Sequence, residues 1–350
     1  ILVFTMEEVW LCRFPGEASA KVSPGSGGTT YSIIAESSSA RYAYGPSISC
    51  RYATTSSMEP FVRPTLSPGD ALRIVAPSGP FDEASFDAGV AFLHTRYEVR
   101  VDDEVRAKKG YLAGDDARRL AELRRALDEE GTRAIVCARG GFGATRLLDG
   151  LDVAQVARAR KLLVGFSDVT ALHALWARAH VGSMHGPMVA WLGRADGDAR
   201  ADWVAALEGR TLHARGLRAI APGRAEGVLL GGNLAVLSAL VGTPYAPPLQ
   251  GAVLFLEEVG EAPYRIDRML TQLRHARWFE GVRAIVLGDL VRCAPGDHGV
   301  AAEDVIAERL GDLGVPVLAG LCAGHGETNH ALPFGARVVV DADAGTLVEG

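Results

Sequence analysis

Residues 161–179 read Lys-Leu-Leu-Val-Gly-Phe-Ser-Asp-Val-Thr-Ala-Leu-His-Ala-Leu-Trp-Ala-Arg-Ala. The apolar run 162–164 predicts a short buried strand, and the residues from about Val169 onward predict a helix. Ser167 lies in the tight turn between them, and a serine at such an elbow exposes its hydroxyl for nucleophilic attack. The match to the Gly-x-Ser-x-Gly pattern is partial, because Gly165 is present but Val169 replaces the second glycine. A helix N-cap serine is the alternative interpretation.

The length of the chain suggests two domains, and its composition is that of a globular protein. It has 350 residues, of which 48% are hydrophobic, and a formal net charge of -6 at pH 7. That apolar fraction allows sizeable cores. The mildly acidic charge argues against a nucleic-acid surface, and no apolar run approaches the length of a membrane-spanning helix. The cysteines are Cys12, Cys50, Cys137, Cys293 and Cys322. They are scattered and include no Cys-x-x-Cys pair, which is typical of a protein from a reducing compartment.

The first sixty or so residues differ from the rest of the chain. Segments rich in Ser, Gly and Tyr, such as 23–30, show no sustained hydrophobic period. A signal peptide is not expected, because the apolar run 1–4 is too short and the acidic Glu7 follows it closely. We expect residues 1–62 to be a disordered extension or translated upstream sequence, with Met58 as a natural start.

Residues 63–190 show the alternation of strands and helices that indicates an α/β domain. The predicted strands are almost free of polar residues, which is typical of a parallel sheet covered by helices on both faces. The helix after Gly114 has the strongest signal, because Asp115 or Asp116 caps it and acidic residues suit its N-terminal dipole. The predicted strands cover 73–77, 97–101, 134–138 and 162–164, and the predicted helices 81–94 and 115–129.

A glycine-rich loop, Arg139-Gly-Gly-Phe-Gly143, follows the strand 134–138. In open α/β sheets ligands bind beyond the carboxyl ends of strands, and this loop and Ser167 occupy such ends on successive strands. One interpretation is a phosphate cradle, although the loop lacks the Gly-x-Gly-x-x-Gly and Gly-Lys-Ser/Thr patterns. Another is an oxyanion hole, with one amide from the loop and one from Asp168. A simple turn is the third.

The charged segment 191–222 is predicted to connect the first domain to a second one at 223–350, with a short helix near 203–207. In the second domain, the apolar strand 252–256 ends at Glu257 and Glu258. Two carboxylates directly after a buried strand favour a functional site, and solvated loop acids are the alternative. The remaining predicted strands cover 226–230, 283–288, 315–321, 337–340 and 346–348, and the predicted helices 233–241, 263–276 and 301–313.

His325 lies between two glycines, which let the backbone bring its imidazole close to another segment. His325, Glu327 and His330 together also suggest a metal site. Their spacing is not His-Glu-x-x-His, and a glycine loop does not aim both histidines in one direction, so we expect no metal and no cofactor. His185, in the predicted loop 181–187, is a second histidine with the chemistry of a base.

Ser167, Glu257 and His325 follow one another along the chain, each after an apolar strand. Acyl transfer at neutral pH needs a serine, an imidazole that takes its proton and a carboxylate that orients the imidazole. The same chain order of serine, acid and histidine occurs in α/β-hydrolases. Because the serine belongs to one domain and the acid and histidine to the second, we expect the active site in the interdomain cleft.

Seven short segments stand in order between about Ser67 and the end of the chain. They are Val75-Ala-Pro-Ser78, Tyr111-Leu-Ala-Gly114, Arg139-Gly-Gly-Phe-Gly143, Gly165-Phe-Ser-Asp168, Gly231-Gly-Asn-Leu234, Leu256-Glu-Glu258 with Pro263-Tyr-Arg265, and Gly324-His-Gly-Glu327. In this order they resemble the LD-carboxypeptidase family, serine peptidases of muropeptide recycling that also include microcin C immunity proteins. No single segment is decisive, but the ordered set is highly specific.

The resemblance implies a flavodoxin-like N-terminal domain with a parallel sheet and a smaller C-terminal α/β domain. It implies that Ser167 is the nucleophile, Glu257 the triad acid and His325 the base. It also suggests an oxyanion hole from the amides of Gly141 and Asp168. The implied reaction is hydrolysis of the amide between an L-centre and a D-amino acid, which releases the terminal D-alanine of a murein tetrapeptide.

A carboxypeptidase also binds the free carboxylate of its substrate, and Arg139, Asn233 and Arg265 are the candidate substrate-binding residues. Two further functions stay open. One is a microcin C-type immunity hydrolase acting on peptidyl- or aminoacyl-adenylates, with Trp191 or Trp203 stacking on adenine. The second is a non-catalytic two-domain protein that binds a small ligand. The resemblance further implies a cytoplasmic homodimer, and we expect no nucleic-acid or membrane partner.

Overall fold

The computed structural model describes residues 23–24, 31–32 and 61–350, and the chain divides into the units Ile1–Met58 and Glu59–Gly350. In the first unit, β1 (Ser23–Pro24) pairs antiparallel with β2 (Tyr31–Ser32). The rest of the expected extension, up to residue 60, lies outside the described residues. The described Val62 belongs to the second unit, because its amide donates to the His180 carbonyl at 2.9 Å.

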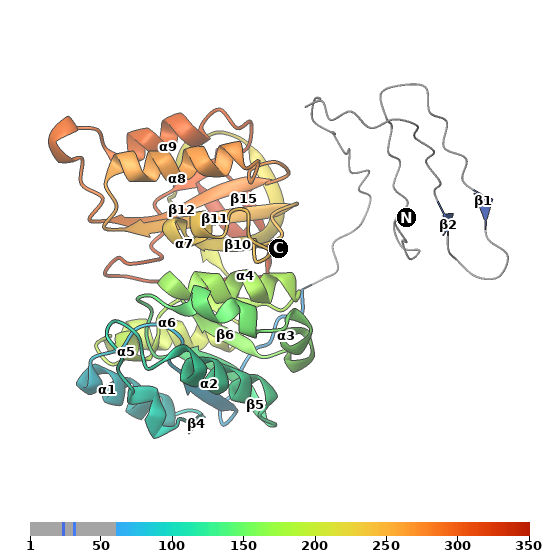
Figure 1. Ribbon diagram of the computed structural model, residues 1–350. Coiled ribbons are helices and arrows are strands. Elements are labelled where there is room, and N and C mark those ends of the chain that lie inside the picture. The colour runs from blue at the N-terminus through green and yellow to red at the C-terminus, as the bar shows by residue number, and fades with distance from the viewer. Residues whose placement is uncertain (1–22, 25–30, 33–60) are drawn as a thin grey trace. The chain divides into compact units, whose positions relative to one another are not determined.

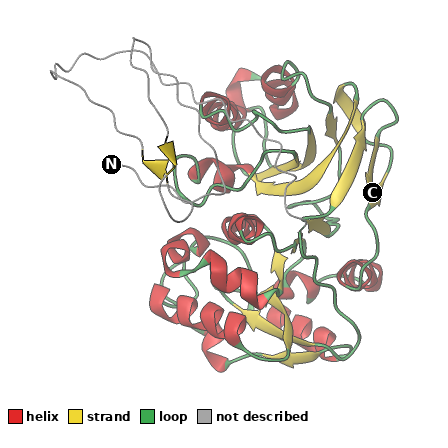
Figure 2. Cartoon of the chain, turned by 90° about the vertical axis from the view of Figure 1, so that its right-hand side faces the viewer, coloured by secondary structure: helices red, strands yellow, loops and turns green. Residues whose placement is uncertain are grey.

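A six-stranded sheet forms the N-terminal half of the second unit (Figure 1 and Figure 2). Its order is β4-β3-β5-β6-β7-β14, and every neighbouring pair is parallel except β7 and β14. The first five strands thus have the order 2-1-3-4-5 of flavodoxin-like folds, which confirms that prediction. The strands are β3 (Ala71–Val75), β4 (Glu98–Arg100), β5 (Thr132–Cys137), β6 (Leu162–Gly165), β7 (Ser183–His185) and β14 (Leu332–Phe334).

Aspartates begin four of the helices in this half. The side chains of Asp82, Asp115, Asp152 and Asp196 each accept a hydrogen bond from a backbone N–H of the first turn. Each bond satisfies a donor that the helix itself leaves unpaired. The helices are α1 (Glu83–His94), α2 (Asp116–Asp128), α3 (Val153–Ala159), α4 (Thr170–Arg178), α5 (Val189–Leu192) and α6 (Gly197–Leu207).

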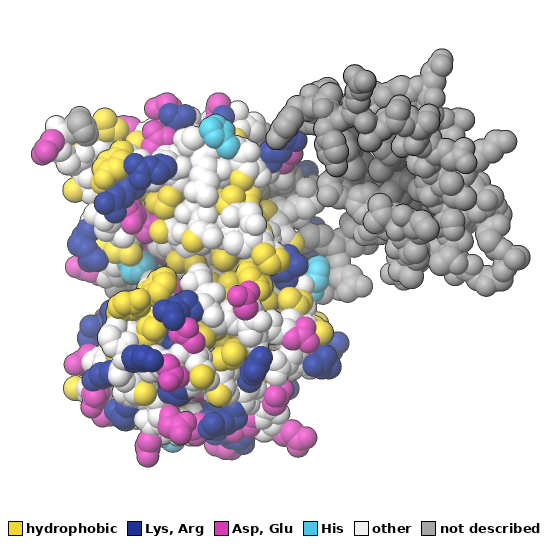
Figure 3. All heavy atoms as spheres, in the orientation of Figure 1, with side chains coloured by type: hydrophobic (Ala, Val, Ile, Leu, Met, Phe, Trp, Pro, Cys, Tyr) yellow, Lys and Arg dark blue, Asp and Glu magenta, His cyan; other side chains and the backbone are white. Residues whose placement is uncertain are grey.

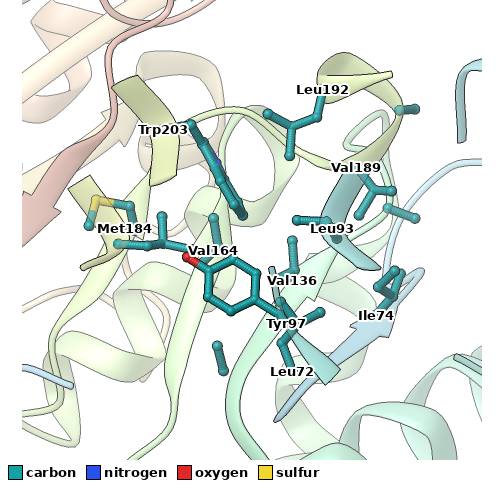
Figure 4. Packing of buried hydrophobic residues seen from close by; sticks show 14 of the residues in the cluster. Leu72, Ile74, Leu93, Tyr97, Val136, Val164, Met184, Val189, Leu192 and Trp203 are labelled. Carbon is teal, nitrogen blue, oxygen red and sulfur yellow. The ribbon is translucent and has the colours of Figure 1, made fainter. Parts of the chain in front are cut away.

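Both faces of this sheet are buried, as the continuous apolar runs of its strands predict. Along β3, Ile74 joins one apolar cluster and Val75 the other, because successive side chains point to opposite faces. Trp203 of α6 packs in the first cluster with Tyr97 and Met184 (Figure 4). The helix predicted near 203–207 therefore forms part of the core of the N-terminal half.

The C-terminal half contains an eight-stranded mixed sheet with the order β8-β16-β15-β10-β11-β12-β13-β9. It has two strands more than the sheet of the N-terminal half. The reason is that β8 and β9, from the predicted connection 191–222, pair with its two edges. The strands are β8 (His213–Ala214), β9 (Arg218–Ala221), β10 (Arg224–Asn233), β11 (Ala252–Val259), β12 (Ala284–Val291), β13 (Val317–Ala319), β15 (Arg337–Asp341) and β16 (Thr346–Glu349). The helices are α7 (Leu234–Ala239), α8 (Pro263–His275) and α9 (Ala302–Leu310).

Two short strands that the sequence did not indicate connect the two halves. Residues 181–187, predicted as a loop, contain β7, and β14 pairs with it in the register Leu332 to His185. The chain therefore crosses from β13 to the N-terminal sheet and returns to the C-terminal one at β15. Helix α4 also lies at the boundary, where it contacts β10 and α7 (Figure 1).

The helices of the described part are short. Helices α2 and α8, with 13 residues each, are its longest, and none of the helices there is long and apolar enough to cross a bilayer. On the face shown in Figure 3, Lys and Arg side chains are interspersed with Asp and Glu. Charges of both signs are therefore mixed on this face.

Candidate active site

Ser167 occupies a strained turn at the carboxyl end of β6. Its φ is +63°, in the left-handed region that residues other than glycine rarely adopt. The strand ends at Gly165, and Ser167 opens a single 3-10 turn that leads directly into α4. Strand, strained serine and helix in this order make up a nucleophile elbow, even though Val169 replaces the second glycine. Val169, not Ser167, stands at the N-cap of α4, so the N-cap interpretation of the serine does not hold.

The glycine-rich loop packs directly against this serine. A Cβ on Gly140 would lie 3.0 Å from the Ser167 Cβ and 3.2 Å from its Oγ, so glycine leaves the room that a hydroxyl and a reacting carbonyl need. Gly141 has a φ of +113°, and its amide donates no hydrogen bond within the described part of the chain. Oδ2 of Asp168 accepts from the Ala144 amide at 2.8 Å, which ties the loop to the elbow. Amides of Gly141 and Asp168 held in this way suit an oxyanion hole.

His325 is hydrogen-bonded to a buried carboxylate. Its Nδ1 lies 2.7 Å from Oε2 of Glu257. The Glu257 side chain is 0% exposed, whereas that of His325 retains 19% exposure. With the Nδ1 proton donated to the carboxylate, the neutral ring offers the lone pair of Nε2 as a base. This pairing is the one that orients the histidine in serine hydrolases.

Phe166 brings the serine turn and the histidine loop together. Its ring centroid lies 4.9 Å from that of His325 in an edge-to-face arrangement. Phe166 directly precedes Ser167 in the N-terminal half, whereas Glu257 lies in β11 and His325 follows β13 in the C-terminal half. The turn that contains Ser167 therefore contacts the loop of His325 through Phe166, and His325 is bonded to Glu257, at a point where the two halves meet. A cavity of about 450 Å³ near Thr132 lies elsewhere, and none of the three lines it.

Glu258 has a structural role beside Glu257. Glu258 is 2% exposed and Glu257 is 1% exposed. Both belong to β11, so neither is a solvated loop acid. Oε1 of Glu258 accepts from Asn233 Nδ2 at 3.0 Å and from the Val259 amide at 2.8 Å, and Oε2 accepts from the Ala235 amide at 2.7 Å. Burial raises the pKa of Glu258. These donors hold the start of α7 against the end of β11.

Asn233, a candidate substrate-binding residue, uses both of its polar atoms inside the protein. Its Oδ1 accepts from the Val236 amide at 3.1 Å and so caps α7, while its Nδ2 bonds to Glu258. The side chain is also buried, with 5% of the residue exposed. The structure therefore gives Asn233 a place in the framework of the site, with both of its polar atoms already engaged within the protein.

The two candidate arginines have different surroundings. Arg139 is exposed, and its Nη1 donates to the Pro80 carbonyl at 2.6 Å, which is the one hydrogen bond of this guanidinium within the described chain. Arg265 is engaged with Tyr264 Oη at 3.2 Å and with Glu261 at 3.4 Å. Arg139 is thus the freer of the two, and it lies next to the glycine that touches Ser167.

His185 does not have the surroundings of a catalytic base. It is 0% exposed, and neither ring nitrogen has a hydrogen-bond partner among the described residues. Burial, with a smaller contribution from His173, lowers the pKa of His185 well below its usual value. The ring packs against Phe255 and Phe334, with centroids 5.0 and 5.4 Å away, so His185 is a neutral core residue.

The surroundings of Trp203 and His330 bear on the adenylate and metal hypotheses. Trp203 is 1% exposed and lies in the apolar cluster (Figure 4). Its indole N–H donates to the Pro187 carbonyl at 3.0 Å, and the partly buried Trp191 packs against the same cluster. The prediction that Trp203 stacks on adenine is therefore wrong, because the Trp203 ring is buried in the core. The two histidines of the metal hypothesis face different carboxylates, because His330 Nδ1 lies 3.1 Å from Asp202.

Sequence reasoning missed two side chains that hold the His325 loop. Oδ1 of Asn329 accepts from the Gly324 amide at 3.0 Å, and Oδ2 of Asp289 accepts from the Gly326 amide at 3.1 Å. The peptide groups on both sides of His325 are thereby fixed. A polar residue at the end of an apolar strand, the same signal that identified Glu257, would have pointed to Asp289.

The chain is similar to known proteins over most of its length. Models of the LD-carboxypeptidase N-terminal and C-terminal domains match residues 72–186 and 226–340. The chain is 42% identical to a putative carboxypeptidase of Streptomyces coelicolor, over 83% of this chain and 96% of that protein. It is 33% identical to the murein tetrapeptide carboxypeptidase of Pseudomonas aeruginosa, over 68% and 82%.

A solved structure has the same fold. It is the muramoyltetrapeptide carboxypeptidase from Oxalobacter formigenes, with a TM-score of 0.71 and 28% identity, covering 80% of this chain and 99% of that one. Both domains of the family are matched in order, and the Streptomyces relative is covered nearly end to end. The chain therefore belongs to the LD-carboxypeptidase family of serine peptidases.

Proposed function

We propose that the protein is a serine-type LD-carboxypeptidase that removes the terminal D-alanine from murein tetrapeptides, with Ser167, His325 and Glu257 as its catalytic triad. The observation that carries this proposal is a strained serine elbow whose Phe166 ring contacts a histidine, and Nδ1 of that histidine is bonded to a buried glutamate. Such a constellation serves acyl transfer. The substrate class follows from the relatives, two of which are named for murein or muramoyl tetrapeptides.

In the acylation step, Oγ of Ser167 attacks the carbonyl carbon that precedes the terminal D-alanine, and Nε2 of His325 takes the hydroxyl proton. Amides of Gly141 and Asp168 stabilise the oxyanion, and the Glu257 carboxylate stabilises the imidazolium. His325 then protonates the amine of D-alanine, the C–N bond breaks, and an ester remains on the serine. In deacylation His325 deprotonates a water, which attacks the ester, and the tripeptide leaves as the proton returns to Oγ.

Removal of a terminal residue requires recognition of its free carboxylate, and we assign this role to Arg139. It directly precedes Gly140, which lies against Ser167, and within the described chain its guanidinium keeps donors beyond the one bonded to Pro80. A guanidinium binds a carboxylate through two parallel hydrogen bonds. We further propose that the protein is a cytoplasmic homodimer that acts in muropeptide recycling.

The competing functions predict different products. An adenylate hydrolase would need an aromatic surface for the base, and the buried Trp203 does not supply it. A non-catalytic binding protein would release nothing. Mass spectrometry of wild type and Ser167→Ala, incubated separately with a tetrapeptide ending in D-alanine, its L-alanine isomer and a peptidyl-adenylate, distinguishes the three. The variant Ser67→Ala, at an exposed position, is the matched control.

The proposal expects wild type and Ser67→Ala to release D-alanine from the first peptide alone, with Ser167→Ala inactive. A metal chelator leaves the rate unchanged, because no step uses a metal. Cleavage of the adenylate without release of D-alanine would replace the proposed function by the immunity hydrolase. Wild-type activity in Ser167→Ala would remove the serine from the mechanism.

A further inference from the structure

The strand pair that carries Glu257 has a bulge. The register between β11 and β12 shifts between Leu256 and Glu258, so that β12 has one extra residue opposite Glu257. Asp289 lies in this bulge. A bulge re-aims the side chain that it carries, and bulges are frequent next to active sites.

The Asp289 carboxylate lies against the loop of the catalytic histidine. Oδ2 accepts from the Gly326 amide at 3.1 Å, and a Cβ on Gly326 would come within 2.6 Å of the same oxygen. The Asp289 amide donates to the Ala323 carbonyl at 3.0 Å, on the other side of His325. Two contacts, one to each side of the histidine, therefore fix this carboxylate close to the reacting groups.

Within residues 61–350, no Lys or Arg side chain forms an ion pair with this carboxylate. Asp289 is half-buried, its Oδ1 accepts no hydrogen bond within residues 61–350, and no ion pair there includes either oxygen. Burial raises the pKa of Asp289, the charge of Glu257 adds to that effect, and His325 and His330 oppose it. A half-buried carboxylate is stabilised by a cationic partner, because partial burial weakens the hydration of its charge. A cation from outside the chain would complete this site.

We propose that Asp289 binds the side-chain ammonium of the substrate residue whose carbonyl Ser167 attacks. The inference rests on the proposed function, in which that residue is the L-centre directly before the terminal D-alanine. Its side chain branches from the carbon next to the reacting carbonyl, and in the proposed binding mode it passes the His325 loop and reaches Asp289. The enzyme then selects tetrapeptides with a cationic diamino acid at this position over those with a neutral one.

The test uses two synthetic tetrapeptides that end in X–D-alanine, with X as lysine or Nε-acetyl-lysine. The two peptides differ in the charge of the side chain at X and have the same sequence elsewhere. We compare kcat/KM for wild type, Asp289→Asn and Asp289→Glu, with Asp304→Asn on an exposed position of α9 as the matched control. An asparagine at this position keeps an oxygen that accepts from the Gly326 amide. The substitution Asp289→Asn therefore removes the charge and leaves the His325 loop attached.

Wild type and Asp304→Asn should prefer the lysine peptide by about tenfold, the range of a partly buried ion pair. Asp289→Asn should lose this preference, because its kcat/KM falls about tenfold further on the lysine peptide, through a higher KM, than on the acetylated peptide. Asp289→Glu should restore the preference. Equal losses on both peptides in Asp289→Asn would show that Asp289 only positions the loop, and would overturn the proposal. Absence of a preference in wild type would overturn it as well.

A binding measurement keeps this inference separate from the hydrolysis. The Kd of each peptide for Ser167→Ala, measured by calorimetry, should differ by the same factor of about ten. If wild type cleaved neither peptide but bound the lysine form more tightly, the proposed function would be wrong and the binding subsite at Asp289 would still be supported.

If Asp289→Asn did not fold, NMR of the carboxyl carbon of Asp289 in ¹³C-labelled Ser167→Ala would report on the contact with the ammonium. Its titration should move to lower pH with the lysine peptide alone, and an equal response to both peptides contradicts the proposal.

Discussion

His325 Nδ1 and Glu257 Oε2 are 2.7 Å apart, and the carboxylate is completely enclosed by protein. The second oxygen of Glu257, Oε1, has no hydrogen-bond partner among the described residues. The histidine is therefore the main polar partner of a carboxylate that has lost its water. This environment strongly favours the tautomer with the proton on Nδ1 and stabilises the imidazolium during catalysis.

Replacement of Glu257 by glutamine should therefore reduce catalysis far more than it alters the fold. Gln is close in shape, but it can present its amino group to Nδ1 and impose the wrong tautomer, and it lacks the charge that stabilises the imidazolium. We expect kcat to fall roughly 10³-fold or more, with KM changed little. Steady-state release of D-alanine measures this, with the exposed Glu303→Gln of α9 as control. A loss below tenfold would show that Glu257 is not the triad acid.

The contact between Gly140 and Ser167 predicts that a single methyl group disturbs the nucleophile. In Gly140→Ala the new Cβ would lie 3.0 Å from the Ser167 Cβ, closer than side-chain atoms normally approach. The serine or the loop must shift by a fraction of an ångström, and such a misplacement costs up to about a hundredfold in rate. Enzyme assays should show this loss while the melting temperature stays near that of wild type. Full activity would mean that the loop is not in contact with the reacting serine.

Glu258 should matter for stability. Its oxygens accept from three donors, the Asn233 amide group and the backbone amides of Ala235 and Val259. A glutamine presents one acceptor and one donor, so at least one of these N–H groups would face another donor in a buried place. We expect Glu258→Gln to lower the free energy of unfolding by about 2 kcal/mol. Urea unfolding checks this, and no change relative to Glu303→Gln would contradict the assigned network.

The pair of Arg73 and Glu129 predicts a pH-dependent contribution to stability. The guanidinium holds the carboxylate through two hydrogen bonds, of 2.6 and 2.8 Å, and this lowers the pKa of Glu129 from 4.5 to about 2. Because the pKa is lower in the folded state, the ionised carboxylate stabilises the fold above pH 4.5, and this stabilisation is lost as the pH falls toward 2. Solvent reaches the pair, so its contribution is about 1 kcal/mol.

The variant Glu129→Gln measures that contribution. Its deficit in unfolding free energy relative to wild type should be present at pH 7 and shrink progressively between pH 4.5 and 2. The exposed Glu130→Gln is the control, since its carboxylate has no ion pair within the described chain. A deficit of the same size at pH 7 and near pH 2 would mean that the charge of Glu129 is not what stabilises the fold.

Much of the site could be predicted because its residues follow apolar strands. Ser167 and Glu257 each stand at the end of a run that has to be buried, and a polar residue there is conspicuous. The parallel sheet was predictable for the same reason, since strands without polar alternation need cover on both faces. The His325 loop was found through its glycines.

The remaining features depend on pairing between distant segments. Strand β14 has three residues, too few to show a period, and it forms only because β7 offers an edge far away in sequence. The burial of His185 follows from that pairing, so a histidine in a predicted loop turned out to be a core residue. The bulge at Asp289 depends on the register of β12 against β11, which no local pattern reports.

The central claim is that Ser167 is the attacking nucleophile, and trapping its acyl ester tests this most directly. Wild-type enzyme is mixed with a tetrapeptide ending in D-alanine, quenched with acid within milliseconds to seconds, digested and analysed by mass spectrometry. The account predicts that the peptide containing Ser167 gains the mass of the tripeptide acyl group, and that Ser167→Ala shows neither adduct nor turnover. An adduct on another residue, or turnover of Ser167→Ala at the wild-type rate, would contradict it.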